Sequence, residues 1–368
     1  MKGLILAGGA GTRLRPITHT SAKQLVPIAN KPILFYVVDD MAAAGIKDIG
    51  VVVSPESGGE IAAALGDGSQ FGVELTFIPQ AEPLGLAHCV RIAADFLGDD
   101  DFVMYLGDNM LQQNLRPLVD RFVAERTRPR ELHEPDTELP AAQILLAHVD
   151  DPRQFGVAEV NAQGGVVRLV EKPADPPSDL ALTGVYIFDK RIHAAVNAIE
   201  PSARGELEIT DAIQWLIDSG MRVDPHTVRG WWKDTGQVQD MLDANRLILD
   251  DLAERVEGEL IDSRVEGRVV IEPGVVLERA TVRGPAIIGA GSRIVDAYIG
   301  PYSAIGEQVT IERAEIEYSI VLSGSSVRDL EGRIEASLIG RNVAVGRSPA
   351  LPKAYRFVVG DNAEIAIL

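Results

Sequence analysis

An aliphatic residue followed by glycine recurs in the last third of the chain, and this repeat strongly restricts the possible folds. Ile-Gly pairs stand at 288–289, 299–300, 305–306 and 339–340, with further branched residues at 294, 311, 316, 321 and 345. From residue 288 to 321 these aliphatic positions are five or six residues apart. Hexad spacing of this kind is typical of a parallel β-helix, in which each hexad forms one side of a triangular coil. We therefore predict a β-helix from about residue 259, with 325–332 as a loop that breaks the register and 351–368 as a tail over the end of the stack.

The first 235 residues follow a different pattern, in which short apolar runs alternate with helical ones. Residues 49–53, 73–78 and 102–106 are predicted to be strands, and residues 31–45, 87–97 and 210–219 to be helices, the last capped by Thr210. This alternation favours an α/β fold with a mostly parallel sheet. The proline- and charge-rich segment 125–142 is predicted to be an exposed loop. The chain is thus divided into a first domain, 1–250, and a β-helix domain, 251–368.

A glycine-rich turn follows the first buried strand, which ends at Ala7. The turn, residues 8–13 (GGAGTR), leaves the backbone uncovered, so successive N–H groups can point at phosphate oxygens. Arg13 and Arg15 add guanidinium groups, which bind phosphate oxygens in pairs. A P-loop is excluded because no lysine follows the glycines, and a dinucleotide fingerprint is excluded because Leu14 stands in place of its third glycine. The turn therefore indicates a phosphate site of another kind.

The overall charge limits the possible partners. A formal net charge of −19 argues against nucleic acids and anionic membranes as partners. It would also repel phosphorylated substrates, so a phosphate site must gather its own positive charge, a divalent cation included. No apolar run approaches the length of about 20 residues that a membrane-spanning helix needs. The single cysteine, Cys89, fits a reducing compartment, and we expect a cytoplasmic protein.

Two aspartates stand where a metal ion could meet the phosphates. Asp108 follows the predicted strand 102–106, and Asp234 lies at another junction between a loop and a helix. Ligands of open α/β sheets bind beyond the carboxyl ends of the strands. Two carboxylates, completed by phosphate oxygens and waters, suit Mg²⁺, which rarely has an all-protein set of ligands. Taken alone, each aspartate is more typical of a helix cap.

Residues 6–14 (LAGGAGTRL) and 22–27 (AKQLVP) resemble the signature of the sugar-1-phosphate nucleotidylyltransferases, and the resemblance extends over nearly the whole chain. Within that family the chain is most similar to the long-form glucose-1-phosphate thymidylyltransferases. The resemblance implies a Rossmann-like nucleotidyltransferase domain followed by a left-handed, hexapeptide-type β-helix. It also implies Mg²⁺-dependent in-line transfer of a thymidylyl group from dTTP to glucose 1-phosphate, which gives dTDP-glucose for deoxysugar biosynthesis and releases pyrophosphate.

The same resemblance assigns roles to individual residues. Asp108 and Asp234 would bind Mg²⁺, Arg13 would hold the leaving pyrophosphate and Lys23 the α- or β-phosphate. Lys172 would grip the phosphate of the incoming sugar, with Arg204 as a second anchor. The other contacts to the nucleotide fall on Leu6, Gly8, Gly9, Gly11, Thr12, Gln24, Gln80 and Gly85. Those to the sugar phosphate fall on Leu86, Gly156, Glu171, Tyr186 and Trp232, of which Tyr186 and Trp232 could equally belong to the core.

The base and the role of the β-helix are less well specified. The amides of Gln24 and Gln80 can match N3–H and O4 of a pyrimidine, whereas thymine differs from uracil by one methyl group, so a preference for UTP or another triphosphate stays open. Some relatives use a β-helix histidine as the base in acetyl transfer, but the six histidines here end at His226. We therefore expect the β-helix to serve regulation or assembly of identical chains. A non-catalytic regulatory subunit is the remaining alternative, although its expected loss of Arg13 or of a metal-binding acid is not found.

Overall fold

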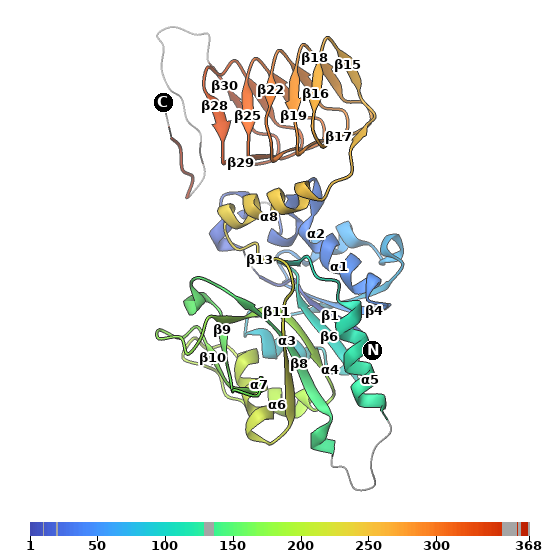
Figure 1. Cartoon of the computed structure of the whole chain (residues 1–368), viewed down its shortest axis with the longest axis vertical. Coiled ribbons are helices and arrows are strands. Elements are labelled where there is room, and N and C mark those ends of the chain that lie inside the picture. Colours follow the sequence, from blue (N-terminus) through green and yellow to red (C-terminus); the bar gives the residue numbers. More distant parts are fainter. Residues whose placement is uncertain (10, 20, 129–135, 348–358, 360–361, 367–368) are drawn as a thin grey trace. The chain divides into compact units, whose positions relative to one another are not determined.

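A computed structural model describes residues 1–9, 11–19, 21–128, 136–347, 359 and 362–366. The chain divides into two compact units, which Figure 1 colours along the sequence. Unit 1 comprises Met1–Ala10, Ala22–Gln24 and Ile33–Asp234, and unit 2 comprises Gly11–Ser21, Leu25–Pro32 and Thr235–Leu368. Within the described part of the chain, no helix is both long enough and apolar enough to cross a membrane.

Unit 1 is built on a nine-stranded sheet with the order β10-β9-β11-β6-β1-β4-β5, to which β8 and β12 are joined through β11. Strands β1 (Lys2–Leu6), β4 (Asp48–Val53), β5 (Glu74–Pro79) and β6 (Phe102–Leu106) are parallel. The first, second and last of these are nearly continuous apolar runs, as expected for strands covered on both faces. Beyond β6 the sheet continues with β11 (Leu180–Phe188), which is antiparallel to it. The predicted α/β class is confirmed, with a mixed sheet.

Helices and further strands of unit 1 complete this layer (Figure 1). Helices α3, α6 and α7 fully bury Val90, Val196 and Ile213 in the same core as Phe102 and Phe188 of the sheet. The helices are α1 (Ile33–Ala43), α2 (Gly58–Leu65), α3 (Leu86–Ile92), α4 (Ala94–Leu97), α5 (Arg116–Thr127), α6 (Ile192–Ala198) and α7 (Ile209–Asp218). The remaining strands are β7 (Asn109–Leu111), β8 (Pro140–His148), β9 (Gly156–Val160), β10 (Val166–Glu171), β12 (Arg222–Thr227) and β13 (Trp232–Asp234).

Four local predictions need correction. The helix predicted over 31–45 begins only at Ile33, because Lys31–Pro32 forms strand β3. The helix predicted over 87–97 is broken at Ala93 into α3 and α4. The predicted loop 125–142 is shorter, because α5 continues to Thr127 and β8 begins at Pro140, while residues 129–135 lie outside the described residues. Thr210 does not cap α7: the cap position is Glu208, and the Thr210 hydroxyl lies inside the helix and donates to Glu171 Oε2 at 3.3 Å.

Unit 2 contains the predicted β-helix, made of three parallel sheets. The sheets have the orders β14-β17-β20-β23-β26-β29, β15-β18-β21-β24-β27-β30 and β16-β19-β22-β25-β28. Successive coils align Val282, Ile299 and Ile316, all fully buried, so one coil takes 17 residues, or two hexads and a pentad. The three parallel sheets and the coil length agree with the predicted left-handed, hexapeptide-type β-helix, so the second part of the fold class is confirmed.

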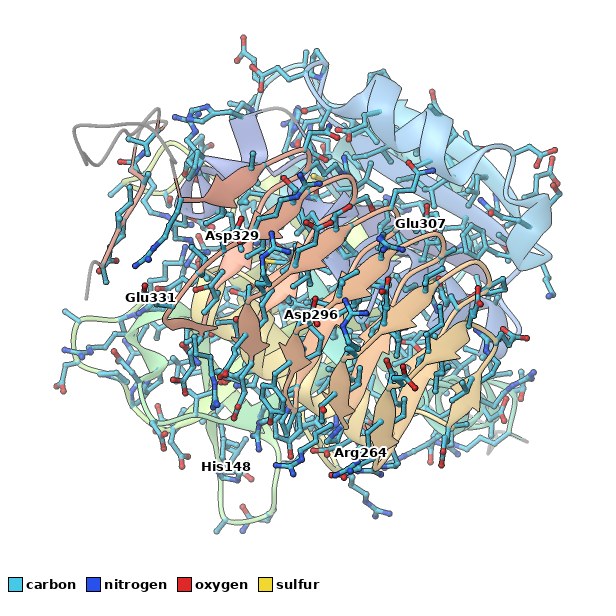
Figure 2. The ribbon with its side chains drawn as sticks, turned by 90° about the horizontal axis from the view of Figure 1, so that it is seen from above. His148, Arg264, Asp296, Glu307, Asp329 and Glu331 are labelled. Atoms are coloured by element: carbon cyan, nitrogen blue, oxygen red, sulfur yellow. The ribbon has the colours of Figure 1, made fainter. Side chains whose placement is uncertain are left out.

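Turns and ion pairs repeat with the coil. Arg279, Asp296 and Arg313 occupy equivalent turns, each with φ close to +50°. Arg279 pairs with Asp296 of the next coil at 2.6 Å, and Arg313 with Asp329 at 2.5 Å. Figure 2 shows Asp296 and Asp329 on the outside of the coils, where solvent screens such pairs and they add little to stability.

The strands of the β-helix correct one further prediction. Residues 325–332 do not form one loop, because Ser326–Arg328 is strand β27, paired in register with β24 and β30. Only the turn after Arg328 carries the extra length, which makes the coil from Val327 to Val345 18 residues long. The predicted tail, 351–368, lies mostly outside the described residues. The strands are β14 (Arg255–Val256), β15 (Glu259–Ile261), β16 (Arg264–Glu266), β17 (Val269–Ile271), β18 (Val276–Glu278), β19 (Thr281–Arg283), β20 (Ala286–Ile288), β21 (Arg293–Val295), β22 (Tyr298–Ile299), β23 (Ser303–Ile305), β24 (Thr310–Glu312), β25 (Glu315–Glu317), β26 (Ile320–Val321), β27 (Ser326–Arg328), β28 (Arg333–Glu335), β29 (Leu338–Ile339) and β30 (Ala344–Gly346).

Helix α8 (Val238–Asp250) precedes the β-helix and contacts it through side-chain hydrogen bonds within unit 2. A capping box between Gln237 and Asp240 starts the helix. Asn245 of α8 is fully buried: its Oδ1 accepts from the backbone N–H of Ala29 at 2.9 Å and its Nδ2 donates to the carbonyl oxygen of Tyr302 at 3.0 Å. Asn245 thus joins the helix to a coil of the β-helix and to the turn between the short strands β2 (Pro27–Ile28) and β3 (Lys31–Pro32).

Candidate active site

A lysine lies between the two aspartates that the sequence singles out. Lys23 is 6% exposed, and its Nζ is 2.5 Å from Asp108 Oδ2 and 3.9 Å from Asp234 Oδ1. Asp108 follows β6, and Asp234 ends β13, whose antiparallel pairing with β7 places Asp234 opposite Asn109. The structure therefore brings together three of the predicted residues, contributed by three distant segments of unit 1.

Two side chains orient Asp108, and sequence reasoning gave neither of them this role. Asn109 Nδ2 donates to Asp108 Oδ1 at 2.9 Å, and the indole N–H of Trp232 donates to Asn109 Oδ1 at 2.7 Å. Trp232 also packs edge-on against Phe155, with ring centroids 5.3 Å apart. Burial raises the pKa of Asp108, but the ion pair and hydrogen bond from Lys23 outweigh it and hold that pKa below its usual range. Asp108 is thus a preoriented carboxylate.

The carboxylate oxygens of Asp108 and Asp234 are suitable ligands for a divalent cation. Both already converge on one cationic group, the Lys23 ammonium, so a positive charge is accommodated at this place. No group of three or more His, Cys, Asp or Glu side chains among the described residues could hold a metal ion alone. A pair of carboxylates with open positions for phosphate oxygens and waters is what Mg²⁺ commonly uses, whereas Zn²⁺ and Ca²⁺ sites take more protein ligands.

The glycine turn of unit 1 faces two buried amides. A Cβ on Gly8 would lie 3.3 Å from Gln80 Oε1, and one on Gly9 would lie 3.7 Å from Gln24 Nε2. Gln24 and Gln80 are 2% and 8% exposed, and Leu6 ends the buried strand before the turn. Gln24 Oε1 is buried and has no hydrogen-bond partner in the part of the chain that the structure describes. A buried acceptor of this kind is available to a ligand that carries a donor.

Three other predicted contacts to the nucleotide belong to unit 2. Gly11 has a φ of 61° and precedes a single 3₁₀ turn, Thr12–Leu14. The guanidinium of Arg13, in that turn, lies against Gly236, where a Cβ would be 2.9 Å from it. The glycine at 236 therefore leaves the space that this arginine occupies.

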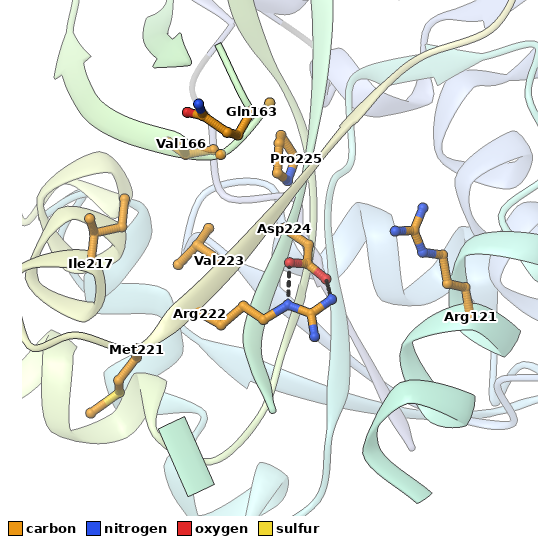
Figure 3. A pocket seen from close by; sticks show the side chains of 11 residues that line it. Arg121, Gln163, Val166, Ile217, Met221, Arg222, Val223, Asp224 and Pro225 are labelled. Atoms are coloured by element: carbon orange, nitrogen blue, oxygen red, sulfur yellow. Dashed lines mark hydrogen bonds and ion pairs between the residues drawn. The ribbon is translucent and has the colours of Figure 1, made fainter. Parts of the chain in front are cut away.

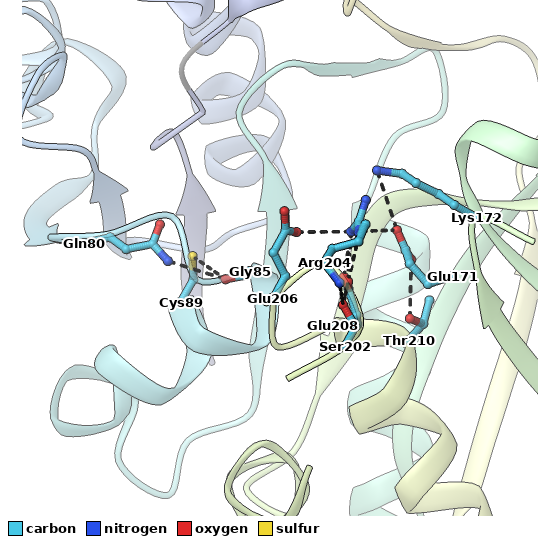
Figure 4. Close-up of polar contacts among 10 residues, drawn as sticks. All are labelled: Gln80, Gly85, Cys89, Glu171, Lys172, Ser202, Arg204, Glu206, Glu208 and Thr210. Atoms are coloured by element: carbon cyan, nitrogen blue, oxygen red, sulfur yellow. Dashed lines mark hydrogen bonds and ion pairs between the residues drawn. The ribbon is translucent and has the colours of Figure 1, made fainter. Parts of the chain in front are cut away.

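Three of the predicted contacts to the sugar phosphate, Glu171, Lys172 and Arg204, lie together (Figure 4). Arg204 donates to Glu208 at 2.9 Å and to Glu206 at 3.1 Å, and its NH2 is 3.5 Å from Glu171 Oε1. Lys172 Nζ is 3.8 Å from the same Glu171 oxygen. Burial and the neighbouring Glu208 raise the pKa of Glu171, against the opposite effects of Lys172 and Arg204. Two cations and an adjacent acceptor for hydroxyl groups can hold a phosphorylated sugar.

Other residues of this region shape the surroundings of Glu171. A Cβ on Gly156 would be 3.2 Å from Glu171 Oε2 and 2.6 Å from the methyl group of Thr210, so glycine is required there. Tyr186 is buried in the core, and burial together with Glu171 raises its pKa far above the ordinary value. Glu208, 3% exposed, fixes Arg204, and sequence reasoning missed this role although Glu208 stands in the same short motif, 202–208 (SARGELE).

The loop before α3 connects the region of Gln80 with that of Arg204. Gly85 has a φ of 100°, and a Cβ there would be 2.4 Å from the carbonyl oxygen of Leu207. Backbone hydrogen bonds join Leu207 N–H to Leu84 at 2.8 Å and Ala87 N–H to Leu207 at 3.0 Å. Leu86, which follows Gly85, packs against the core of unit 1.

A separate pocket of about 410 Å³ lies between β12 and the turn at 163–165, and no predicted site residue lines it. Figure 3 shows the paired side chains Arg222 and Asp224 within it, joined by two hydrogen bonds of 2.7 Å. This arginine is satisfied by the chain itself, so the pocket offers no free guanidinium from β12.

Comparisons with known proteins found similar chains. The model of the nucleotidyl transferase family matches residues 2–251. The chain is 53% identical to a glucose-1-phosphate thymidylyltransferase of Streptomyces griseus, over 100% of this chain and 99% of that protein. It is 46% identical to a low-salt glycan biosynthesis nucleotidyltransferase of Haloferax volcanii, over the full length of both. Among solved structures, a Bacillus anthracis protein assigned as a glucose-1-phosphate thymidylyltransferase, in complex with a sucrose, matches with a TM-score of 0.62 and 35% identity, over 69% of this chain and 98% of that one.

Proposed function

Because the chain belongs to the nucleotidyl transferase family, we propose that it transfers a thymidylyl group from dTTP to glucose 1-phosphate. An oxygen of the sugar phosphate attacks the α-phosphorus, the bond from the α-phosphorus to the bridging oxygen of the β-phosphate breaks, and pyrophosphate leaves. The products are dTDP-glucose and pyrophosphate, and no covalent enzyme intermediate is needed. The observation that carries the proposal is the nearly buried Lys23 held between Asp108 and Asp234, beside full-length relatives named for this activity.

We assign each phosphate to cationic groups of this acidic chain. Lys23 binds the α- or β-phosphate, and Arg13 holds the pyrophosphate as it leaves. Lys172 and Arg204 hold the phosphate of the incoming sugar, and Glu171 accepts hydrogen bonds from the sugar hydroxyls. In-line attack needs the nucleophile and the leaving group on opposite sides of the α-phosphorus, so positioning and charge neutralisation account for the catalysis.

We assign Asp108 and Asp234 as the residues that would hold Mg²⁺. When bound, the ion would neutralise charge that develops on the phosphates. The chain's own part is to orient the carboxylates, which the hydrogen bond from Asn109, itself held by Trp232, supports for Asp108. The first domain, 1–250, would carry this chemistry, and 251–368 would serve assembly of identical chains.

The only cysteine of the sequence, Cys89, is buried and free, in keeping with a cytoplasmic enzyme.

The direct test mixes the purified protein with glucose 1-phosphate, Mg²⁺ and one triphosphate at a time, and measures pyrophosphate release. We expect kcat/KM to be highest for dTTP, with the value for UTP next. The difference between the two should be modest, since one methyl group is worth only about 1–3 kcal/mol. Faster release with ATP or GTP would contradict the assignment of the base. D108N should abolish turnover, and release that persists unchanged in D108N would favour a non-catalytic subunit with contaminating activity.

A further inference from the structure

The orientation of the Gln80 carboxamide is fixed by two groups of unit 1. Gln80 Nε2 donates to the carbonyl oxygen of Gly85 at 3.4 Å and contacts Nδ1 of His88 at 3.1 Å. A carbonyl oxygen only accepts hydrogen bonds, so the amide nitrogen of Gln80 must face this side. An amide nitrogen only donates, so His88 Nδ1 must accept, and the imidazole is neutral with its proton on Nε2. The contact to His88 is the shorter of the two and therefore the stronger constraint.

The partners of Gln80 are themselves held in place. The carbonyl oxygen of Gly85 also accepts from Cys89 Sγ at 3.5 Å, as Figure 4 shows. The φ of 100° at Gly85 is one that glycine adopts without strain. Burial lowers the pKa of His88, and so does Arg91 in the same helix, while Glu82 acts in the opposite sense. The neutral ring that can accept from Gln80 is thus the favoured form.

This arrangement leaves Gln80 with one polar group for a ligand. Both hydrogens of Nε2 are directed at groups of the chain, whereas Oε1 lies on the side of the glycine turn, 3.3 Å from the position of a Cβ on Gly8. Gln80 is 8% exposed, and turning its carboxamide over would direct Oε1 at two acceptors, the Gly85 carbonyl oxygen and His88 Nδ1. Toward the turn it therefore presents an acceptor and no donor.

We propose that His88 is a positioning residue for base selection, which orients Gln80 so that Oε1 accepts a hydrogen bond from the base. The inference rests on the proposed function and on the expectation from the sequence that the Gln80 amide contacts the base of the triphosphate. An acceptor there favours thymine and uracil, which carry a hydrogen at N3, and disfavours cytosine, whose N3 is an acceptor. Gln80 would then read N3–H alone, in place of the expected pairing with both N3–H and O4.

Comparing the variants H88N and H88L separates the effect of losing the hydrogen-bond acceptor from the effect of changing the size of the side chain. The two side chains have nearly the same shape, and Asn Oδ1 is as many bonds from the backbone as Nδ1 of histidine. The measurement is the ratio of kcat/KM for dTTP to that for dCTP, with glucose 1-phosphate and Mg²⁺. We expect H88N to keep this ratio within about threefold of the unaltered enzyme, and H88L to lower it about tenfold, because Gln80 is then free to turn Nε2 toward cytosine N3.

Two additions keep the test decisive. H88F retains an aromatic ring without an acceptor and should behave like H88L, so a folding defect of one variant does not block the comparison. UTP, which shares N3–H and O4 with dTTP, should follow dTTP in every variant. Equal loss of the ratio in H88N and H88L would show that only size matters, and an unchanged ratio in both H88L and H88F would show that His88 does not orient Gln80. Either result overturns the inference, whereas an unaltered enzyme that shows no preference for dTTP or UTP over dCTP would instead overturn the proposed base.

Discussion

Replacing Lys23 with methionine removes the cation that the two aspartates share, while it keeps most of the side-chain volume. With an effective dielectric constant of about 20, unit charges 2.5 Å apart attract by about 7 kcal/mol and those 3.9 Å apart by about 4 kcal/mol. Desolvation of the ammonium offsets much of this sum, because Lys23 is only 6% exposed. Breaking a buried pair by removal of one partner typically costs about 3–5 kcal/mol, so we expect K23M to lose roughly that much stability without metal.

The assay is thermal unfolding of the full-length protein with and without Mg²⁺. In K23M the ion can take the place of the missing ammonium between Asp108 and Asp234, and stabilisation of about 2.7 kcal/mol is expected at a concentration of 100 times its Kd. R126M is the matched control. Arg126 also lies between two carboxylates, 2.9 Å from Asp101 and 2.6 Å from Asp189, but Asp189 keeps its ion pair with Arg191 at 2.7 Å when Arg126 is removed. R126M should therefore lose stability that Mg²⁺ does not restore.

Two results would refute this reasoning. If K23M unfolds at the same temperature as the unaltered protein without metal, the ammonium does not compensate the two carboxylates. If Mg²⁺ stabilises R126M as much as K23M, the effect of the ion is general, and Asp108 and Asp234 have no special affinity for it. Loss of turnover in K23M is expected as well, but it would not separate these cases.

Three further predictions follow from single contacts. The raised pKa of Glu171 means that it becomes protonated, and stops accepting hydroxyl hydrogens, at a higher pH than an ordinary glutamate, so KM for glucose 1-phosphate should rise as pH falls through that range and E171Q should flatten the profile. G85A should unfold at a lower temperature than G220A, because both positions have a positive φ but only at Gly85 would the Cβ meet a backbone oxygen, at 2.4 Å. N245L leaves the buried N–H of Ala29 and the partly buried carbonyl oxygen of Tyr302 without their partner and should cost about 2–4 kcal/mol in urea unfolding.

The β-helix could be predicted from the sequence because its information is local and repeated. Each side of a coil needs one inward aliphatic residue, so Ile294, Ile299 and Ile305 reveal the period directly. The error over 325–332 has a physical reason as well. Extra length in a coil can be accommodated in a turn, so β27 stays in its sheet although the spacing along the sequence changes.

Elements stabilised by distant partners were harder to predict. Helix α5 is largely polar, with only Leu118, Val119 and Phe122 buried. The charge-rich segment that follows it continues the same polar composition, so the end of the helix could not be located from the sequence. Strand β12 (RVDPHT) contains a proline and polar residues, and it forms because β8, far away in the sequence, pairs with it. The hydrophobic periodicity and the β-propensity of a segment do not indicate which distant strand will pair with it.

The site also contains residues that local motifs identify and residues whose role depends on distant partners. Motifs identified Lys23, Asp108 and Asp234, and the structure places them together. The supporting hydrogen bonds from Asn109 and Trp232 were not predicted, because their two positions are 123 residues apart and the resemblance assigns Trp232 to the sugar phosphate. The division of the site between substrate phosphates stays a prediction.

Arg204 gives the sharpest test of that assignment, because two acids with different burial hold the same guanidinium. Glu206 is 39% exposed and Glu208 is 5% exposed, as side chains, at 3.1 and 2.9 Å from Arg204. An exposed pair is worth about 0.2–1 kcal/mol, so E206Q removes a competitor for the sugar phosphate at little cost in stability and should lower KM for glucose 1-phosphate up to about fivefold.

E208Q should act in the opposite direction on the same parameter. The buried carboxylate of Glu208 accepts from Nε and NH2 of Arg204 and so fixes the plane of the guanidinium. Without that charge the guanidinium loses its orientation, and KM for glucose 1-phosphate should rise about tenfold or more. Since both substitutions remove one negative charge beside the same cation, a general electrostatic effect would lower KM in both. Opposite signs are expected only if Arg204 binds the sugar phosphate and Glu208 orients it, and equal signs would contradict the role of Arg204.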